Sequence, residues 1–342
     1  MSASADDSPH DIPGLRWGIL ATGGIAHAFA RDLRTAGLDL VAVGSRSVES
    51  AARFAAEFGI PRAHGSYAEL VADPDVDIVY VSTPHPMHAQ NALLALEHGK
   101  HVLVEKPFAL NELEAAAVRD AAAERGLLAM EAMWTRYLPH MVRVREILAS
   151  GMLGPLRAVL ADHSQRLPDD PGHRLNALDL GGGALLDLGI YPVSFAWDVF
   201  GAPATVQAAA RRKETGADAE IATIFTYAGG EVATTFSTSM AAGPNTATIL
   251  GQDARIEIDR VWYTPTSFRV VSAAGDVLED YVSHVEGRGM QYQAFAAERL
   301  VAAGRLAGDV LPIDKTVAIM GTLDEIRRQI GLAYPGEEPA QR

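Results

Sequence analysis

Short apolar runs rich in β-branched residues alternate with amphipathic stretches through the first 131 residues. Runs of this kind form buried parallel strands, and the stretches between them form the helices of βαβ units. The pattern therefore predicts an α/β fold with a doubly wound parallel sheet. The expected strands are 15–21, 39–44, 61–64, 77–82, 101–105 and 127–131, with helices at 24–36, 48–58, 66–72, 86–98 and 111–125.

The pattern changes after Met133, where strand-like segments follow one another through short turns. This succession is typical of an antiparallel sheet. We expect a doubly wound domain at 14–132 and, at 133–335, an α+β domain built on a mostly antiparallel, open-faced sheet. The expected strands of the second domain are 155–163, 204–213, 219–228, 231–239, 246–250 and 254–258, with helices at 138–150, 181–199, 289–303 and 314–331.

Composition excludes several classes of protein. The 342 residues carry a formal charge of −14, which disfavours nucleic acid as a partner, and no cysteine, which removes disulfides and thiolate chemistry. No apolar run approaches the ~20 residues that span a bilayer. Residues 1–13 lack the features of a signal peptide and are expected to be a disordered leader. We expect a cytoplasmic protein with no membrane partner.

A glycine-rich turn, Ala21-Thr-Gly23-Gly24-Ile25-Ala26, follows the first strand. Glycine at this point lets backbone N–H groups approach a pyrophosphate at a helix N-terminus. Gly23 fits the second glycine of a G-x-G-x-x-G/A motif, whereas Ala21 replaces the first. An ordinary strand-to-helix turn is the alternative. The position in the first βα unit favours dinucleotide binding, with Gly23, Gly24 and Ile25 as cofactor-binding residues.

The end of the second strand bears on the choice between NAD and NADP. NAD-binding folds place a carboxylate there for the ribose 2′-hydroxyl. This strand instead ends Gly44-Ser45-Arg46-Ser47, without a carboxylate. Arg46 could bind a 2′-phosphate, with Ser45 and Ser47 as neutral donors. The sequence favours NADP over NAD, and a solvent-exposed arginine without a ligand is the alternative for Arg46.

Two further strand ends open onto the nicotinamide end of such a cleft. In the strand order 3-2-1-4-5-6, loops after the fourth and fifth strands lie there. The fourth contributes Thr83, His85 and His88, and the fifth contributes Glu105 and Lys106. We expect all but Lys106 to bind the cofactor, although either histidine could have no chemical role. No third ligand has matching spacing, so no metal site is expected.

Lys106 ends an apolar strand just before Pro107, and only four of the 29 basic residues are lysines. A partly desolvated lysine can lose its charge at low cost, and its ammonium can polarise a reacting oxygen or hold a shared proton. A lysine at this position therefore indicates a chemical role that an arginine could not fill. The alternative is a strand-end lysine paired with Glu105 or Asp187. Glu105 is expected to orient Lys106.

The helix predicted at 181–199 places Asp187 and Tyr191 four residues apart, on one helical face. Burying a carboxylate and a phenol requires partners, which Lys106 and a substrate would supply. Alternatively, Asp187 caps a neighbouring element and Tyr191 packs in the core. Trp134 and Arg136 follow the last strand of the first domain, at the domain junction. Trp134 could stack on a substrate or pack at a hinge.

Three motifs together resemble the glucose–fructose oxidoreductase and inositol dehydrogenase (Gfo/Idh/MocA) family. Longer segments resemble its branch of dimeric dihydrodiol dehydrogenases and NADP-dependent D-xylose dehydrogenases. The motifs are Glu105-Lys106-Pro107, Ala21-x-Gly23-x-Ile25-Ala26 and Asp187-x-Gly189-x-Tyr191, and the segments include Arg16-Trp-Gly-Ile, Met130-Glu-Ala-x-Trp134-Thr-Arg136 and Gly182-Gly-Ala-Leu-Leu-Asp187.

The resemblance implies roles for these residues. Lys106 would be the catalytic lysine, Tyr191 an acid/base group and Asp187 the carboxylate that orients Lys106 or the substrate. Trp134, Arg136 and Tyr191 would contact the substrate. The open face of the second sheet would pair with another subunit, giving a dimer or larger oligomer. Two features depart from the family pattern: Ala21 is not glycine, and Ser50 and Ala51 supply no second base near Arg46.

The expected function is an NADP-dependent oxidoreductase. It would transfer a hydride between the nicotinamide and a hydroxyl-bearing carbon of a sugar, polyol or trans-dihydrodiol, with Lys106 and Tyr191 assisting the proton transfer. One alternative is a keto-sugar reductase that works in the opposite direction. The other is a dinucleotide-binding sensor or regulator without turnover, which would need the cofactor cleft but not Lys106, Asp187 and Tyr191 together.

Overall fold

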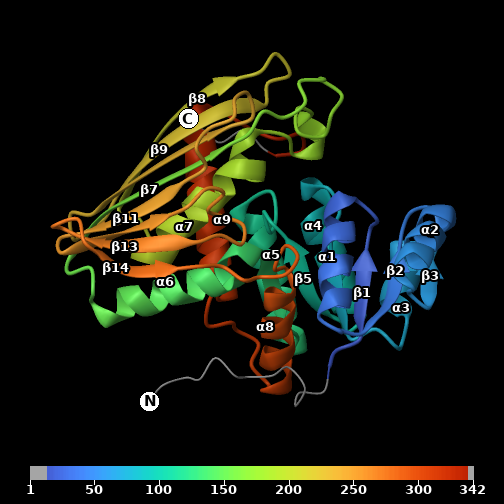
Figure 1. Cartoon of the computed structure of the whole chain (residues 1–342). Coiled ribbons are helices and arrows are strands. Elements are labelled where there is room, and N and C mark those ends of the chain that lie inside the picture. Colours follow the sequence, from blue (N-terminus) through green and yellow to red (C-terminus); the bar gives the residue numbers. More distant parts are fainter. Residues whose placement is uncertain (1–13, 338–342) are drawn as a thin grey trace.

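Six parallel strands form the sheet of the N-terminal half (Figure 1), in a computed structural model that describes residues 14–337. Their order is β3-β2-β1-β4-β5-β6, which confirms the predicted doubly wound sheet. The leader predicted at residues 1–13 lies outside the described residues. The strands are β1 (Trp17–Leu20), β2 (Leu40–Gly44), β3 (Arg62–His64), β4 (Ile78–Val81), β5 (His101–Glu105) and β6 (Ala129–Ala132). The helices are α1 (Gly24–Thr35), α2 (Val48–Phe58), α3 (Tyr67–Ala72), α4 (His88–Glu97) and α5 (Glu112–Arg125).

Side-chain caps define where several of these helices begin. Ser47, Ser66 and Asn111 each accept a hydrogen bond from the backbone N–H three residues on. At α5 the Glu114 carboxylate also accepts from the N–H of Leu110, the residue before the cap, at 3.0 Å. Asn111 and Glu114 therefore both hold the start of α5.

The C-terminal half contains an eight-stranded sheet in the order β14-β13-β12-β11-β7-β10-β9-β8. Only β7 and β10 pair in parallel, so the prediction of a mostly antiparallel sheet is confirmed. Two strands, β13 and β14, were not predicted, and β14 is largely exposed and carries two carboxylates. The strands are β7 (Leu156–Ser164), β8 (Thr205–Arg212), β9 (Asp218–Thr226), β10 (Val232–Thr238), β11 (Ala247–Gly251), β12 (Ala254–Ile258), β13 (Phe268–Ser272) and β14 (Val277–Tyr281).

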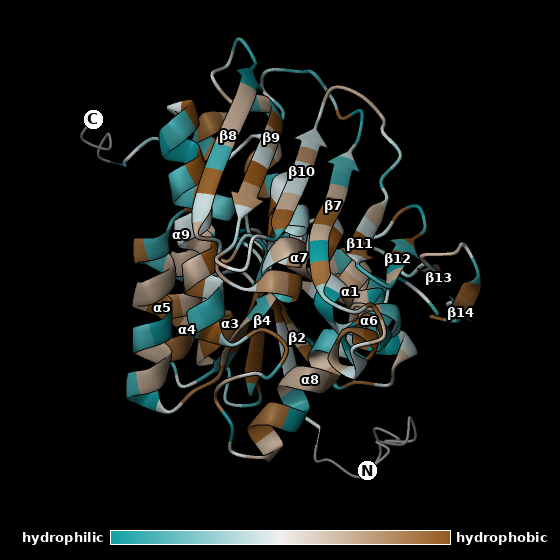
Figure 2. Ribbon diagram, turned by 90° about the vertical axis from the view of Figure 1, so that its left-hand side faces the viewer, coloured by the Kyte–Doolittle hydropathy of each residue, from teal (hydrophilic) through white to brown (hydrophobic). Residues whose placement is uncertain are grey.

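Helices join the two halves. Helix α7 (Ile190–Phe200) packs on one face of the eight-stranded sheet, whereas strands β7 to β10 present their other face without a covering helix (Figure 2). Helix α6 (Pro139–Ser150) follows β6, and α8 (Gln291–Ala302) and α9 (Ile313–Ile330) pack back on α1 and α5 of the first half. Glu298 of α8 accepts from Trp17 Nε1 at 2.9 Å, so β1 is tied to the C-terminal half.

The chain reaches α7 through a π-helical turn, Leu185–Gly189, rather than through the continuous α-helix predicted at 181–199. Asp218 caps this turn, because its buried Oδ2 accepts from the Leu185 N–H at 2.6 Å. Burial raises the pKa of Asp218 to about 6. Gly183 lies against the same carboxylate with a φ of +139°, and a Cβ there would come within 2.0 Å of Asp218 Oδ1. A glycine at 183 is therefore part of the cap.

Replacing this glycine should loosen the helix start. We expect Gly183→Ala to lower the free energy of unfolding by at least about 2 kcal/mol, because the alanine meets both backbone strain and a steric clash. Gly99→Ala is the matched control, since Gly99 also has a positive φ, +74°, but open space around it. Urea unfolding followed by circular dichroism measures both. Equal losses for the two variants would contradict the role of Asp218 as a cap that needs glycine.

Candidate active site

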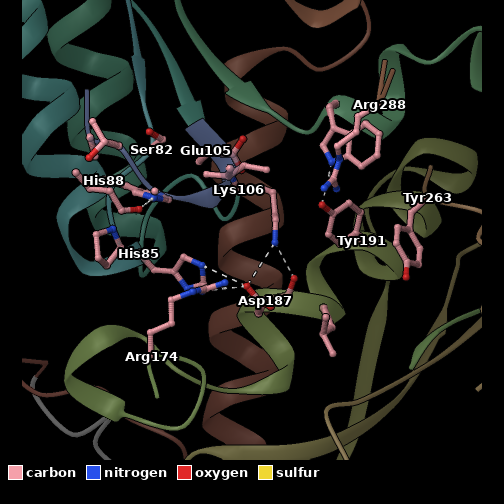
Figure 3. Close-up of a pocket in the computed structure, with 18 of the residues that line it drawn as sticks. Ser82, His85, His88, Glu105, Lys106, Arg174, Asp187, Tyr191, Tyr263 and Arg288 are labelled. Atoms are coloured by element: carbon pink, nitrogen blue, oxygen red, sulfur yellow. Dashed lines mark hydrogen bonds and ion pairs between the residues drawn. The ribbon is translucent and has the colours of Figure 1, made fainter. Parts of the chain in front are cut away.

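A cavity of about 510 Å³ lies between the two halves, at the carboxyl ends of β1, β2, β4 and β5 (Figure 3). This is where ligands bind in doubly wound sheets. Most of the predicted site residues line it, and Gly24 and Arg136 do not. The predicted residues in its lining are Gly23, Ile25, Ser45, Arg46, Thr83, His85, His88, Glu105, Lys106, Trp134, Asp187 and Tyr191.

The turn after β1 has the form of a phosphate cradle. Helix α1 begins after Gly23 with no side-chain cap and no acidic residue in its first turn, so its N–H groups are open to an anion. A Cβ at Gly23 or Gly24 would meet nothing within 4 Å, which leaves room for a ligand. Ala21 adopts a φ of +85° where the motif has its first glycine, a conformation that costs an alanine about 1–2 kcal/mol.

Arg46 and Ser45 line the cavity beyond this turn, together with Tyr67. Burial raises the pKa of Tyr67, and the positive charge of Arg46 opposes that rise, so the phenol is neutral beside the guanidinium. Ser47 is not in the lining, because its hydroxyl caps α2 and donates to Glu49 at 2.7 Å. Of the two serines predicted as donors, only Ser45 faces the cavity.

Lys106 extends from the end of β5 into the middle of the cavity and meets the second half of the chain there (Figure 3). Its Nζ donates to the backbone carbonyl of Asp187 at 2.7 Å and lies 3.7 Å from Asp187 Oδ1. The same Nζ is 4.9 Å from the centre of the Tyr191 ring. Asp187 thus has an ion-pair partner, and the π turn that carries it brings Asp187 and Tyr191 to the same lysine.

The charges of these three groups are fixed by burial and by one another. Burial opposes the charge of Lys106, but its acidic neighbours Tyr191, Asp187 and Glu105, which also titrate, more than offset this effect and raise the pKa of the lysine. Burial also acts against the Asp187 carboxylate, yet Lys106, His85 and Arg174 lower its pKa to about 2. The site therefore holds an ammonium and a carboxylate, which favours the role of Lys106 as an ammonium over its role as a lysine that loses its charge.

Tyr191 lies beside this ion pair with its hydroxyl held by a tryptophan. Burial raises the pKa of Tyr191, so it is a neutral phenol at pH 7. Trp134 Nε1 donates to the Tyr191 hydroxyl at 2.9 Å. The phenol proton is therefore free to be donated to, or shared with, a ligand in the cavity. Trp134 is 1% exposed and also lines the cavity, so its two predicted roles, packing and substrate contact, are compatible.

The histidines around the cavity are neutral. Burial lowers the pKa of His85 to about 3, of His88 to about 4 and of His163 to about 3. His88 lies between the backbone carbonyls of Thr83 and Pro107, each 2.7 Å from a ring nitrogen, and as a neutral imidazole it donates to only one of them. His88 thus joins the loops after β4 and β5. His85 Nδ1 lies 3.1 Å from the Gly181 carbonyl and Nε2 3.8 Å from Asp187 Oδ1.

Glu105 is held from behind the cavity. The hydroxyl of buried Tyr80 donates to its Oε1, and its Oε2 accepts from the Lys106 backbone N–H at 3.2 Å. Burial raises the pKa of Glu105, whereas Tyr80 and Lys106 act to lower it. Glu105 therefore contacts Lys106 through the backbone, and Asp187, not Glu105, pairs with the ammonium.

Arg136 does not reach the cavity. Its guanidinium is buried and donates to the Ser194 carbonyl and to Asp198 at 2.9 Å, on the far side of Tyr191. Its position does not support the predicted contact with substrate. The physical reason is that Arg136 lies within a short 3₁₀ turn, Trp134–Tyr137, in which residues two apart, such as Trp134 and Arg136, point in different directions.

Several residues of the lining were not predicted, because they come from distant loops. Their sequence neighbourhoods carry no local signal of a role at this site, although His163 ends a predicted strand. They are Tyr67, His163, Gln165, Arg174, Tyr263 and Arg288, and the lining also contains Thr22, Ser82, Pro84 and Leu188, which were not predicted either. Within residues 14–337, no cluster of three or more His, Asp or Glu could hold a metal ion, and no helix is long and apolar enough to cross a membrane.

Comparisons with known proteins agree with this architecture. A model of the oxidoreductase family with an NAD-binding Rossmann fold matches residues 15–133, and a model of the GFO/IDH/MocA C-terminal domain matches residues 141–257. Trans-1,2-dihydrobenzene-1,2-diol dehydrogenase from Mus musculus is 36% identical over 334 residues, covering 95% of this chain and 99% of that protein. D-xylose 1-dehydrogenase (NADP(+)) from Hypocrea jecorina is 36% identical over 366 residues, covering 94% and 93%.

Solved structures extend the likeness to the whole fold. An aldose-aldose oxidoreductase from Caulobacter crescentus, complexed with glycerol, is 26% identical with a TM-score of 0.83, covering 93% of this chain and 97% of that one. A 3-ketoreductase from Actinomadura kijaniata, complexed with NADP and TDP-benzene, is 26% identical with a TM-score of 0.81, covering 93% and 98%. Together with the two family models, these relatives confirm the resemblance seen in the sequence, and the chain belongs to the GFO/IDH/MocA family of oxidoreductases.

Proposed function

We propose that this protein is an NADP-dependent oxidoreductase that transfers a hydride between the nicotinamide and a hydroxyl-bearing carbon of a sugar, polyol or trans-dihydrodiol. The observation that carries the proposal is the ammonium of Lys106 in the cavity between the two halves, 2.7 Å from the Asp187 carbonyl and 4.9 Å from the Tyr191 ring. The dihydrodiol and D-xylose dehydrogenases that resemble the chain support this substrate class.

The residues of the cavity fit a dinucleotide. The uncapped start of α1 and the open space at Gly23 suit a pyrophosphate, and Arg46 with Ser45 suits a 2′-phosphate. Thr83, His85, His88 and Glu105 would line the nicotinamide end. When bound there, NADP supplies the hydride acceptor or donor. NAD would bind the same cleft without the contact to Arg46.

The proposed chemistry of the chain itself is proton transfer. Lys106 would bind the reacting oxygen through its ammonium, and Asp187 would fix its position and keep it charged. The Tyr191 phenol, held by Trp134, would share the proton of the substrate hydroxyl with Lys106. The two groups lie close enough to titrate as a pair, so the proton belongs to the pair.

The protonation state bears on the direction of reaction. With Lys106 charged and Tyr191 neutral, these two groups can donate a proton, as the reduction of a ketone requires. Reduction of a keto-sugar is therefore the second candidate function. A sensor without turnover is disfavoured, because binding a dinucleotide does not require Lys106, Asp187 and Tyr191 in one place.

We further propose that the open face of the eight-stranded sheet binds a second copy of the chain. Leu160, Ile224 and Phe236 lie on this face and are 44%, 44% and 42% exposed. The register places Leu160 of β7 opposite Thr234 of β10, which in turn lies opposite Ile224 of β9, so the apolar side chains form one patch. An apolar patch on a sheet without covering helices is typical of an interface between subunits.

Removing the lysine ammonium should stop catalysis and spare cofactor binding. We expect Lys106→Met to lower kcat/KM by about 1,000-fold, and Tyr191→Phe by about 10–100-fold. The Kd for NADP+, measured by fluorescence titration, should change by no more than about threefold, since neither side chain faces the phosphates. Lys315→Met is the control, because Lys315 lies outside the cavity. Full turnover in Lys106→Met would contradict the mechanism. A cooperative thermal unfolding transition, at whatever temperature, shows that the variant is folded.

Arg46 should decide between the two dinucleotides. We expect Arg46→Ala to raise the KM for NADP+ at least about tenfold and to leave the KM for NAD+ within about threefold, because only NADP carries the 2′-phosphate. Arg53→Ala is the matched control, since Arg53 lies on the exposed face of α2 and donates to Ser50. An equal rise in the KM for NADP+ and for NAD+ in Arg46→Ala would show that this arginine does not bind the 2′-phosphate.

A charge in the apolar patch should prevent assembly. We expect the wild-type chain to sediment as a dimer or larger species at micromolar concentration, and Phe236→Asp to sediment as a monomer, because a carboxylate would be buried unpaired in the interface. Leu113→Asp is the control, since Leu113 is 82% exposed on α5, away from the sheet. A monomeric wild-type chain would exclude the proposed interface.

A further inference from the structure

A short loop holds one arginine at the edge of the cavity. Gly287 and Gly289, on either side of Arg288, both have positive φ, +71° and +81°. A Cβ at Gly287 would come within 2.5 Å of Asp32 Oδ1, and one at Gly289 within 2.3 Å of Leu138. The loop is thus fitted closely to its surroundings, and its conformation depends on glycine at both positions.

The loop is anchored to the cofactor-binding half. Asp32, buried on α1, accepts from the Arg288 backbone N–H at 3.2 Å and from the Met290 N–H at 2.8 Å. Arg288 therefore keeps a defined position relative to the glycine-rich turn that precedes α1. A freely moving surface arginine would not need such an anchor.

The side chain of Arg288 lies in the cavity lining without an ionic partner. Its guanidinium carbon is 5.3 Å from the centre of the Trp134 ring, next to Tyr191 and Tyr263 in Figure 3. Among residues 14–337, no carboxylate lies within ion-pair distance, 4.0 Å, of this guanidinium. By contrast, the arginines nearby on α6, Arg143 and Arg145, are paired with Glu279 and Asp198.

The other charged side chains of the cavity have partners or an assigned role. Lys106 and Arg174 both contact Asp187, at 3.7 and 3.4 Å, and Arg46 lies at the far end where the 2′-phosphate would bind. Glu105 is engaged by Tyr80 and the Lys106 backbone. The histidines are uncharged, so within residues 14–337 Arg288 is the cation without an ion-pair partner at the end lined by Trp134 and Tyr263.

We propose that Arg288 binds an anionic group of the substrate, a carboxylate or a phosphate ester, so that the preferred substrate is an acidic sugar or polyol rather than a neutral one. This inference rests on the proposed function and names its substrate class. A guanidinium supported on an aromatic face presents two parallel N–H donors, the arrangement that matches a carboxylate or phosphate. Gln165, whose Nε2 donates to the Tyr263 hydroxyl at 3.0 Å, offers polar atoms for the neutral hydroxyls of such a substrate.

The first experiment compares matched substrates. Initial rates of NADP+ reduction by the full chain are measured with D-glucuronate, D-galacturonate and D-glucose 6-phosphate, and with D-glucose and D-galactose as their neutral counterparts. We expect kcat/KM for one anionic class to exceed that of the neutral sugars by at least about tenfold, mainly through KM. The uronates and the phosphate ester distinguish a carboxylate from a phosphate. The preference should fall as salt is added, because the guanidinium is solvent-accessible.

Variants assign the preference to the guanidinium. Arg288→Met should reduce the ratio of anionic to neutral kcat/KM to near one and change the rates with neutral sugars by no more than about threefold. Arg288→Lys should retain part of the preference, because it keeps the charge and loses the paired donors. Arg299→Met is the control, an exposed arginine on α8 outside the cavity lining.

Three results would overturn the inference: no anionic preference in the wild-type chain, an equal loss on both substrate classes in Arg288→Met, or a weaker Kd for NADP+ in that variant with the preference intact. If only neutral sugars or a trans-dihydrodiol turn over, the proposed function is supported and the anion site is rejected. If no substrate turns over in either direction, the proposed function fails. Calorimetric titration of D-glucuronate and of D-glucose into the chain with NADPH then tests the anion site on its own. Tighter uronate binding that is lost in Arg288→Met supports the anion site, and equal binding rejects it.

Discussion

The contact between Lys106 and Asp187 is the constraint on which the site depends. The lysine ends the fifth strand of the first half, and the carboxylate lies in the π turn of the second half, so this buried pair joins the two parts of the chain inside the cavity. Removing one member of a buried pair leaves a charge without compensation, at a cost of about 3–5 kcal/mol. The Asp218 cap and Gly183 hold the π turn, and they therefore also hold Asp187 against the lysine.

Several titratable neighbours of this charged pair are neutral. Three imidazoles at the cavity are neutral, and Tyr191 is a neutral phenol, so the ammonium is not surrounded by competing cations. Burial is the main cause in each case, since a low-dielectric site disfavours each additional charge. The result is a cavity in which a single mobile proton can be shared between Lys106, Tyr191 and a reacting oxygen. Proton transfer of this kind contributes typically about 10²–10⁴-fold to a rate.

The sequence predicts the parts of this arrangement that local pattern and topology determine. The strand order brings the ends of β1, β4 and β5 together, so Gly23, His85 and Lys106 could be placed in one cleft before their contacts were known. The π turn, the pairing of Lys106 with Asp187 instead of Glu105, and the position of Arg288 depend on contacts between residues far apart in the chain. No local periodicity encodes these contacts. Arg136 shows the same limit, because a 3₁₀ turn directed it away from the cavity.

Trp134 contacts both Tyr191 and Arg288. Its indole N–H holds the hydroxyl of Tyr191, and its ring supports the guanidinium of Arg288. One rigid, buried side chain therefore sets the distance between the group that would move the proton and the group that would bind a distant anion. Contacts far from the reacting carbon accelerate a reaction only when they position that carbon. A fixed spacing between Tyr191 and Arg288 would use binding energy to orient the substrate. In a chain with a charge of −14, a cationic cavity also offsets the repulsion that an anionic ligand would meet outside it.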